Sequence, residues 1–278
     1  MYMKEKINMA QYDLSSEELR QIHQIQLNML IQVDDICRRH DIHYNIIAGT
    51  LLGAIRHKGY IPWDDDADVA LFRKDYERFR TVCKEELDKS QYYFQDHTNT
   101  KGYRWGYGKF RKKGTLFLRK NQEDMPYEQG IFIDIFPLDK VPANLILRSF
   151  HNFHCFCIRK IMWSSVGKKQ EKNLFKKMCY SILSYIPEDI FLHHYDSFTK
   201  KSNYLKSDWV RILTYPTPTK DYGYRKRWYE ESIEIEFEGK MFYGIKDWDE
   251  YLTFKFGNYW ILPEQEKRKT HPITKLKL

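Results

Sequence analysis

The chain has 278 residues, a formal net charge of +8, and 42% hydrophobic and 16% aromatic residues. This composition excludes a disordered chain, and the size prior of roughly 100 to 200 residues per domain allows one large domain or one domain with an appendage. No stretch offers the roughly 18 uninterrupted apolar residues of a membrane span, and we find no internal repeat. The positive charge favours acidic partners, such as nucleic acid, nucleotides, phosphorylated glycans or an anionic membrane, unless it is only a solvated surface.

The cysteines and the N-terminus bear on the cellular compartment. Five cysteines, an odd number without Cys-x-x-Cys spacing, favour reduced thiols over a zinc site. Residues 1–6 run into polar sequence and lack the apolar core of a signal peptide. We therefore expect a cytoplasmic location, with the inner face of the membrane as an open alternative.

Helix and strand signals alternate in the first part of the chain. Ser15 and Glu18 form a capping box, and apolar residues at helical spacing predict a helix from there to about His40. Residues 44–48 predict a short strand that ends at Gly49-Thr50 and leads into a short helix. Residues 67–72 predict a second strand, with a further helix behind it over about residues 76–87.

Aromatic and β-branched runs follow, bounded by turn residues. These runs, at residues 92–94, 108–111, 115–118 and 131–136, predict strands that complete a mixed sheet. Residues 142–209 are aromatic, basic and helix-like. The C-terminal part predicts a hairpin around Gly239 and a short helix from Asp247.

An acidic cluster lies between the first two strands. Asp64, Asp65, Asp66 and Asp68 repel one another, and a fold tolerates this only if a cation or many hydrogen-bond donors compensate. Along a strand, Asp66 and Asp68 point to the same face. Two adjacent carboxylates are hard oxygen ligands suited to magnesium.

Two other interpretations of the cluster stand beside the metal site. An arbitrary run of aspartates is commonly a solvated turn. A calcium loop of the EF-hand type is the second alternative, but its register fails, because Val69 occupies the position that needs glycine and Asp75 the position that needs glutamate.

Asp134 adds a third carboxylate. It lies inside the apolar run 131–136, where an uncompensated charge would cost several kcal/mol, so it needs a partner. A metal shared with Asp66 and Asp68 would supply one. Exposure to solvent or pairing with a lysine remains the alternative.

Residues 48–71, which contain Gly49-Thr50 and the cluster, resemble the signature of the LicD family of lipopolysaccharide and teichoic-acid phosphocholine transferases, related to fukutin. Segments 109–115, 130–139 and 237–271 agree with the family in order, and the resemblance covers roughly residues 20 to 272. Ala48-Gly49 departs from the family's usual double glycine.

The resemblance implies an α+β fold of the nucleotidyltransferase type seen in the DNA polymerase beta superfamily. We expect a mixed sheet flanked by helices, with a helical, aromatic-rich C-terminal half. Residues 1–141 would form the catalytic core with its N-terminal helix. Residues 142–278 would form a family-specific region packed on that core as one continuous unit.

The resemblance also implies the chemistry: transfer of a phospho-alcohol group, phosphocholine from CDP-choline above all, onto a sugar of a cell-surface glycan or lipid-linked precursor, with release of CMP. Mg²⁺ or Mn²⁺ is the implied cofactor. Asp66, Asp68 and Asp134 are the expected catalytic residues and, with Asp64, the expected metal ligands. The residues expected to bind substrate are Gly49, Thr50, Arg56, Lys58, Lys109, Arg111 and His271.

Two alternatives come from other functional classes. A nucleotidyltransferase proper would use the same carboxylates on a nucleoside triphosphate and release pyrophosphate. A basic module built on residues 144–195 could instead bind a membrane surface. We expect no nucleic-acid partner, because the chain has the charge but no recognition motif.

Overall fold

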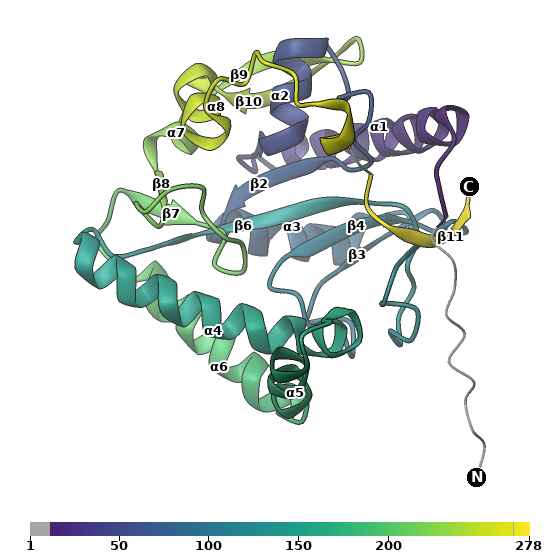
Figure 1. Cartoon of the computed structure of the whole chain (residues 1–278). Helices are drawn as coiled ribbons and strands as arrows, with labels where there is room; N and C mark the ends of the chain where they lie inside the picture. Colours follow the sequence, from purple (N-terminus) through teal and green to yellow (C-terminus); the bar gives the residue numbers. More distant parts are fainter. Residues whose placement is uncertain (1–11, 269) are drawn as a thin grey trace.

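The computed structural model describes residues 12–268 and 270–278. The expectation that residues 1–6 lack a signal peptide lies outside this range. A central sheet separates helices α4, α5 and α6 below it from α2 and α8 above it (Figure 1). The helices are α1 Ser16–Arg39, α2 Ala48–His57, α3 Arg73–Glu86, α4 Leu145–Gln170, α5 Leu174–Leu183, α6 Glu188–Asn203, α7 Arg227–Glu230 and α8 Trp248–Phe256, with a 3₁₀ turn at Gln265–Lys267.

The main sheet is mixed, as predicted. Its strands are ordered β3-β4-β6-β2-β1-β10-β9, and β7 and β8 extend it from β6. β2 runs parallel to β6 and β1 parallel to β10, while the other pairs are antiparallel. The strand bounds are β1 Asn45–Ile46, β2 Asp68–Phe72, β3 Tyr92–Gln95, β4 Gly108–Lys112, β5 Leu116–Arg119, β6 Phe132–Lys140, β7 Trp209–Arg211, β8 Tyr224–Arg225, β9 Ser232–Phe237, β10 Lys240–Ile245 and β11 Ile273–Lys277.

Helix α1 begins as the sequence predicts. The Ser15 hydroxyl accepts a hydrogen bond from the Glu18 amide at 3.2 Å, and the Ser15 amide donates to the Glu18 carboxylate at 2.9 Å. Ile22, Met29 and Val33 are fully buried at helical spacing. This apolar face packs α1 against β4, β6 and α3.

Strand β5 differs from the prediction. It leaves the main sheet and forms a separate two-stranded sheet with β11 at the C-terminus. Gly114, with a φ of 80°, turns the chain away after β4, in a conformation that glycine adopts without steric cost. The placement of residues 115–118 in the main sheet is therefore wrong, because their partner lies more than 150 residues away in the chain.

The C-terminal half contributes both helices and strands. The predicted hairpin around Gly239 is confirmed: Glu238 and Gly239 both have positive φ, which matches the twist of two tightly connected strands. Its strand β10 pairs with β1, so residues before and after the expected boundary at 141/142 share one sheet. The division into two regions remains a prediction.

Helices α4, α5 and α6 form a second layer with its own apolar core. Cys155, Ile158 and Met162 of α4 are buried against Phe191 and Tyr195 of α6. A methyl group at Gly167 of α4 would lie 2.8 Å from the ring of Tyr180 on α5, so this glycine allows the two helices to approach closely. Within the described residues, no helix is both long and apolar enough to cross a membrane.

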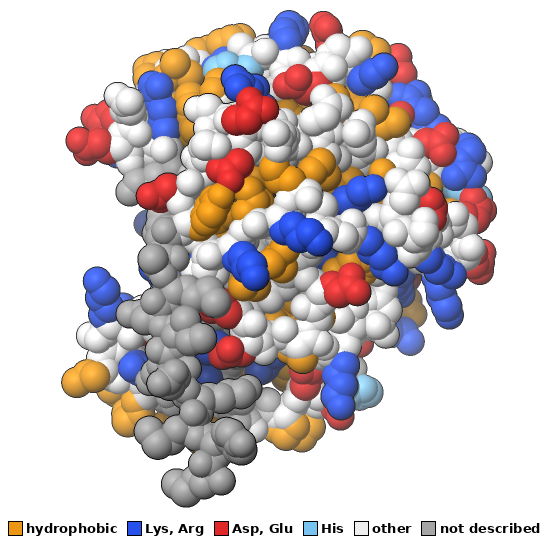
Figure 2. All heavy atoms as spheres, turned by 90° about the vertical axis from the view of Figure 1, so that its right-hand side faces the viewer, with side chains coloured by type: hydrophobic (Ala, Val, Ile, Leu, Met, Phe, Trp, Pro, Cys, Tyr) orange, Lys and Arg blue, Asp and Glu red, His pale blue; other side chains and the backbone are white. Residues whose placement is uncertain are grey.

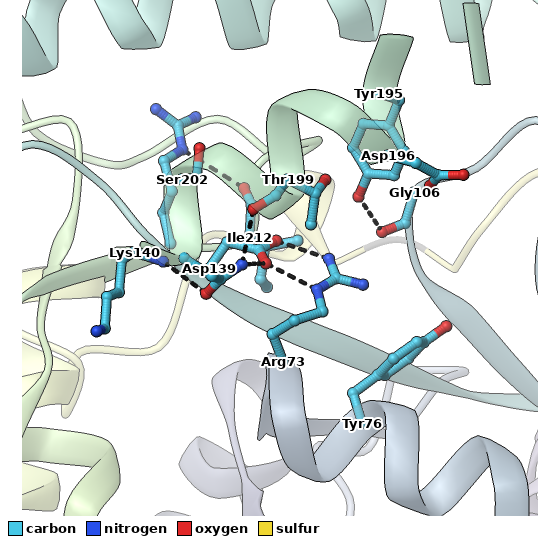
Figure 3. A network of polar contacts seen from close by, with 12 residues as sticks. Arg73, Tyr76, Gly106, Asp139, Lys140, Tyr195, Asp196, Thr199, Ser202 and Ile212 are labelled. Carbon is cyan, nitrogen blue, oxygen red and sulfur yellow. Dashed lines mark hydrogen bonds and ion pairs between the residues drawn. The ribbon is translucent and has the colours of Figure 1, made fainter. Parts of the chain in front are cut away.

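A buried ion pair ties this layer to the sheet (Figure 3). Asp139, near the end of β6, has no exposed surface and accepts two hydrogen bonds of 2.7 Å from Arg73, at the start of α3. Asn203, the last residue of α6, donates to the same carboxylate at 2.7 Å. Three elements distant in the sequence therefore meet at one charge.

We expect Arg73→Met to lower the free energy of unfolding by about 3 to 5 kcal/mol, because it leaves the buried Asp139 carboxylate without its cation. Urea denaturation monitored by circular dichroism measures the change. Arg73→Met/Asp139→Leu should recover part of the loss, since no buried charge then remains unpaired.

Arg20→Met is the matched control. It removes an arginine from an ion pair with Glu17 whose two side chains are 71% and 61% exposed. Such surface pairs contribute little, so the midpoint of unfolding should stay near that of the unmodified protein. Equal losses in the two arginine variants would contradict the assignment.

Candidate active site

Three carboxylates meet where β2 and β6 run side by side. The parallel register places Asp68 opposite Asp134, and Asp66 precedes Asp68 by two residues. One ligand oxygen from each of the three lies within 4.8 Å of the others. The structure thus brings together the three residues that the sequence analysis expects to be catalytic.

Helix α1 holds the loop that carries the cluster. Gln26 is buried, and its amide nitrogen donates to the Asp65 carbonyl oxygen at 2.8 Å and to the Phe132 carbonyl oxygen at 3.0 Å. His23 Nε2 lies 2.7 Å from the Asp64 carbonyl oxygen. Through Gln26, the acidic loop is attached to the start of β6.

Helix α2 supports the cluster from the other side. The buried Thr50 hydroxyl accepts a hydrogen bond of 2.7 Å from the Asp68 amide. A methyl group at Gly49 would lie 2.6 Å from Asp64 Oδ2, so only glycine allows this close approach. Both residues lie in the first turn of α2, whose partial positive charge favours nearby anions. Ala48, with a φ of 50°, adopts the left-handed conformation that glycine prefers.

The Asp65 carboxylate is bonded to His271, near the C-terminus. Its carboxylate accepts a 2.7 Å hydrogen bond from the His271 amide and lies 2.6 Å from His271 Nδ1. Burial alone would lower the pKa of His271, but the hydrogen bond and charge of Asp65 raise it above the ordinary value. The same Nδ1 is 3.6 Å from Asp66, so Asp65, Asp66 and His271 form a second group with metal-ligand spacing.

The carboxyl groups facing the site are removed from water and lie close to one another, and both effects disfavour their charged forms. Burial, followed by the charges of its neighbours Asp66 and Asp65, raises the pKa of Asp64 to about 7. Burial also raises the pKa of Asp66, and it raises that of Asp68 well above its ordinary range, with Asp66 and Asp134 adding to the effect. Within the described residues, the Asp68 side chain accepts no hydrogen bond, so hard oxygen atoms remain free for a divalent cation such as Mg²⁺.

Asp134 has a lysine partner as well as its two carboxylate neighbours. Lys109 of β4 lies opposite Asp134 in the antiparallel register, and the two form a buried ion pair through Asp134 Oδ1. Burial lowers the pKa of Lys109 to about 7, although the charge of Asp134 opposes this. The ammonium group lies 3.2 Å from the centre of the Phe132 ring.

Arg111 shares a face of β4 with Lys109, and its guanidinium lies 5.3 Å from the same Phe132 ring. Two of its donors point away from the carboxylates, because Nε donates to the Gln95 side-chain oxygen and NH1 to the Gly130 carbonyl oxygen, each at 2.7 Å. Lys109 is therefore the member of this pair that reaches the carboxylates.

Arg56 and Lys58 lie at the C-terminal end of α2, whereas Gly49 and Thr50 lie at its start. The rise of an α-helix separates the two ends of this ten-residue element by about 15 Å. Arg56 donates to the Tyr259 carbonyl oxygen at 2.6 Å, and Lys58 is exposed. The geometry therefore places these two predicted substrate-binding residues apart from the first turn of α2.

Sequence reasoning missed two cations near the site. The charge of Arg119, on β5, lowers the pKa of Asp66, and the charge of Lys255, on α8, lowers that of Asp68, although burial outweighs both. Within the described residues, Arg119 forms no ion pair. No local motif marks either residue, because β5 and α8 reach the carboxylates only through the tertiary fold.

An aromatic cavity of about 390 Å³ opens beside the site. Tyr107, on its wall, lies 5.4 Å from Lys109 Nζ, and its hydroxyl is 3.4 Å from that of Tyr215. Burial, followed by the neighbouring Tyr107 and Asp134, raises the pKa of Tyr215 well above its ordinary value. The other side chains that line the cavity include Trp105, Trp163, Tyr180, Arg159 and Lys160.

We expect the metal-free protein to lose stability as the pH rises from about 4 to 7. An unfolded aspartate releases its proton near pH 4, whereas folded Asp64 retains it up to about pH 7. The unfolded state then binds fewer protons than the folded state, so the free energy of unfolding falls with pH.

Thermal melts across this pH range measure the effect. Mg²⁺ competes with these protons, so it should raise the melting temperature more at pH 8 than at pH 5. Asp66→Asn removes one repelling charge and should flatten the pH profile. A magnesium shift independent of pH would contradict the proposed metal site.

We expect Thr50→Val to destabilise the fold by about 1 to 3 kcal/mol, because the buried Asp68 amide then has no acceptor. It should also weaken magnesium binding by moving the Asp68 carboxylate. Thr50→Ser keeps the hydroxyl and serves as the control in urea denaturation and in magnesium titrations. Equal stability of the valine and serine variants would show that this hydrogen bond does not position Asp68.

The chain is similar to known proteins over much of its length. Residues 41–151 match the family model described as LicD/FKTN/FKRP, nucleotidyltransferase domain. The chain is 29% identical to the lipopolysaccharide cholinephosphotransferase LicD of Haemophilus influenzae over 92% of its own length and 96% of that protein. It is also 32% identical to an uncharacterized protein of Rickettsia typhi over 71 residues. This alignment covers 26% of this chain and 22% of that protein.

The matched domain contains all the carboxylates of the site. Asp64, Asp66, Asp68 and Asp134 lie within residues 41–151, while His271 and Lys255 lie outside the domain match. The longer alignment extends over most of both chains. Residues 41–151 therefore form a LicD-type domain, and the similarity to a phosphotransferase of this kind extends over most of the chain.

Proposed function

We propose that this chain transfers phosphocholine from CDP-choline to a sugar hydroxyl of a cell-surface glycan or teichoic-acid precursor and releases CMP, with Mg²⁺ as its cofactor. The observation that supports this most is the meeting of Asp66, Asp68 and Asp134 at the junction of β2 and β6. The name of the H. influenzae relative adds support for the phosphocholine group.

Asp66 and Asp68 would hold the metal, with Asp64 beside them. A bound magnesium ion neutralises diphosphate oxygens and the charge that develops on the leaving phosphate. Arg119 adds positive charge that acts on Asp66, and Lys255 adds positive charge that acts on Asp68. The first turn of α2, with Gly49, can direct backbone N–H groups toward a phosphate.

Asp134 is the proposed acceptor of the sugar proton. Lys109 holds Oδ1, and within the described residues the other oxygen, Oδ2, accepts no hydrogen bond. A hydroxyl placed at that oxygen would be oriented and could pass it a proton. Lys109 keeps the Asp134 carboxylate in one rotamer. Because its pKa is lowered to about 7, Lys109 adds little fixed positive charge there.

We assign the aromatic cavity to the acceptor. Aromatic walls with a few polar groups are typical of small-molecule sites. Arg159 and Lys160 line the cavity as well, and their positive charge disfavours a quaternary ammonium while it favours an anionic or phosphorylated sugar. Tyr107 and Tyr215 connect this cavity to Lys109 and Asp134.

A second candidate is a nucleotidyltransferase that attacks a nucleoside triphosphate and releases pyrophosphate. The description of the matched family model, which names a nucleotidyltransferase domain, supports this second candidate. Incubation with CDP-choline or with CTP, using lipopolysaccharide and teichoic acid as acceptors, separates the two. CMP as product supports phosphocholine transfer, and pyrophosphate supports the alternative.

We expect Asp66→Asn to reduce transfer from CDP-choline by more than about 100-fold, because even groups that only orient a metal ligand contribute about 10- to 100-fold. EDTA should abolish the activity of the unmodified protein, and Mg²⁺ should restore it. Chromatographic detection of CMP measures both effects.

Asp88→Asn is the control, because this carboxylate is exposed and lies in the turn before β3. Its activity should equal that of the unmodified protein. Near-normal turnover of a folded Asp66→Asn protein would refute the assignment of this residue. Thermal shifts with CDP-choline, CDP-glycerol and CDP-ribitol then identify the donor, since a ligand that binds the native state raises the melting temperature.

A further inference from the structure

Helices α4 and α5 each expose a row of large apolar side chains. Ile146, Phe150 and Phe153 recur at helical spacing along α4, and Leu174, Met178 and Ile182 recur along α5. Each of the six is more than half exposed, up to 82% for Leu174. We call these six side chains the α4–α5 surface. Proteins rarely expose this many large apolar side chains on two neighbouring helices unless a partner binds there.

These side chains are not part of the internal core. The opposite side of α4 carries Cys155, Ile158 and Met162, which are buried against α6. On α5, Tyr180 is buried and packs on Gly167 of α4. Both helices therefore have one apolar side that the fold buries and a second apolar side that it leaves exposed.

Basic residues accompany this surface. Residues 144–187 contain eight Lys and Arg and a single acidic residue, Glu171, so this segment has a net charge of +7 in a chain of +8. Lys172, Lys176 and Lys177 are exposed and form no ion pair within the described residues. By contrast, positive and negative side chains are interspersed over the face that carries α1 (Figure 2).

We propose that the α4–α5 surface docks on an anionic lipid bilayer, with both helices lying in the plane of the interface. Exposed Phe and Leu side chains enter the boundary between headgroups and acyl chains, and flanking lysines pair with anionic headgroups. A second copy of the chain fits less well, because residues 144–187, which carry this surface, have a net charge of +7 in each copy and would repel each other.

The surface is continuous with the proposed acceptor cavity. Phe153 and Phe156 line a groove together with Arg159, and Arg159 also lines the aromatic cavity beside Tyr107. A glycan attached to a membrane lipid could therefore reach Asp134 from the docked helices. This route rests on the proposed function, whereas docking rests only on the exposed apolar and basic side chains.

Sedimentation with lipid vesicles tests the proposal. The full chain should sediment with vesicles of phosphatidylcholine containing 30% phosphatidylglycerol at least about 100-fold more strongly than with pure phosphatidylcholine, and less strongly as salt is raised. Phe150→Ser/Phe153→Ser should weaken binding by at least about 10-fold, since each buried aromatic contributes strongly to insertion. Lys172→Gln/Lys176→Gln/Lys177→Gln should weaken it by about 100-fold, at about 1 kcal/mol for each lysine.

Matched variants on other surfaces control for general effects. Lys84→Gln/Lys89→Gln/Lys101→Gln removes three exposed lysines outside α4 and α5, and Met241→Ser/Ile261→Ser removes two exposed apolar side chains. Both should bind vesicles like the unmodified protein. Circular dichroism and thermal melts confirm that every variant is folded.

Three outcomes would overturn the proposal. The first is no sedimentation with anionic vesicles at low salt. The second is equal binding by the α4–α5 variants and their controls. The third is a dimer in sedimentation equilibrium that Phe150→Ser/Phe153→Ser dissociates without any vesicle binding, which would assign the surface to a second copy. All three are independent of catalysis, so failure of CDP-choline turnover does not affect them.

Discussion

The parallel pairing of β2 with β6 determines the geometry of the site. Its register places Asp68 opposite Asp134, and a shift of one residue would turn one of these carboxylates to the other side of the sheet. Val69, Leu71 and Ile135 are buried on one face of the sheet, and Ala70 and Phe136 are buried on the face that carries Asp68 and Asp134, so burial of apolar side chains on both faces holds this register. The carboxylates lie together because the hydrophobic core keeps the two strands in step.

This arrangement is unfavourable without compensation. Several carboxylates close to one another and partly removed from water raise each other's pKa, as they do for Asp64 and Asp68. Lys109 compensates Asp134, and His271 compensates Asp65. Asp66 and Asp68 are the carboxylates least compensated by positive side chains. A divalent cation, or a cationic group of a substrate, would neutralise them.

Strand β6 connects the site to the helical layer. Asp134 lies near its start and Asp139 near its end, where Arg73 and Asn203 bond the Asp139 carboxylate. Because α6 is attached there and α4 packs on α6, the α4–α5 surface has a defined position relative to the carboxylates. Under the proposed docking, this connection would set where a membrane-attached acceptor meets the carboxylates.

The sequence by itself determined the features that depend on neighbouring residues. The capping box at Ser15, the hairpin at Gly239 and the strand of β2 with its Asp-x-Asp pattern all follow from local hydrogen bonds, turn conformation and side-chain alternation. The family resemblance likewise rested on a continuous segment, residues 48–71, and the family comparison agrees with it.

Only the tertiary structure decided which distant residues meet these motifs. It paired β5 with β11, Lys109 with Asp134 and His271 with Asp65, and it brought Arg119 and Lys255 toward the cluster. These contacts join residues from 25 to 206 positions apart. No local pattern encodes them, because strand register and the burial of apolar faces across the whole chain determine which side chains come within reach.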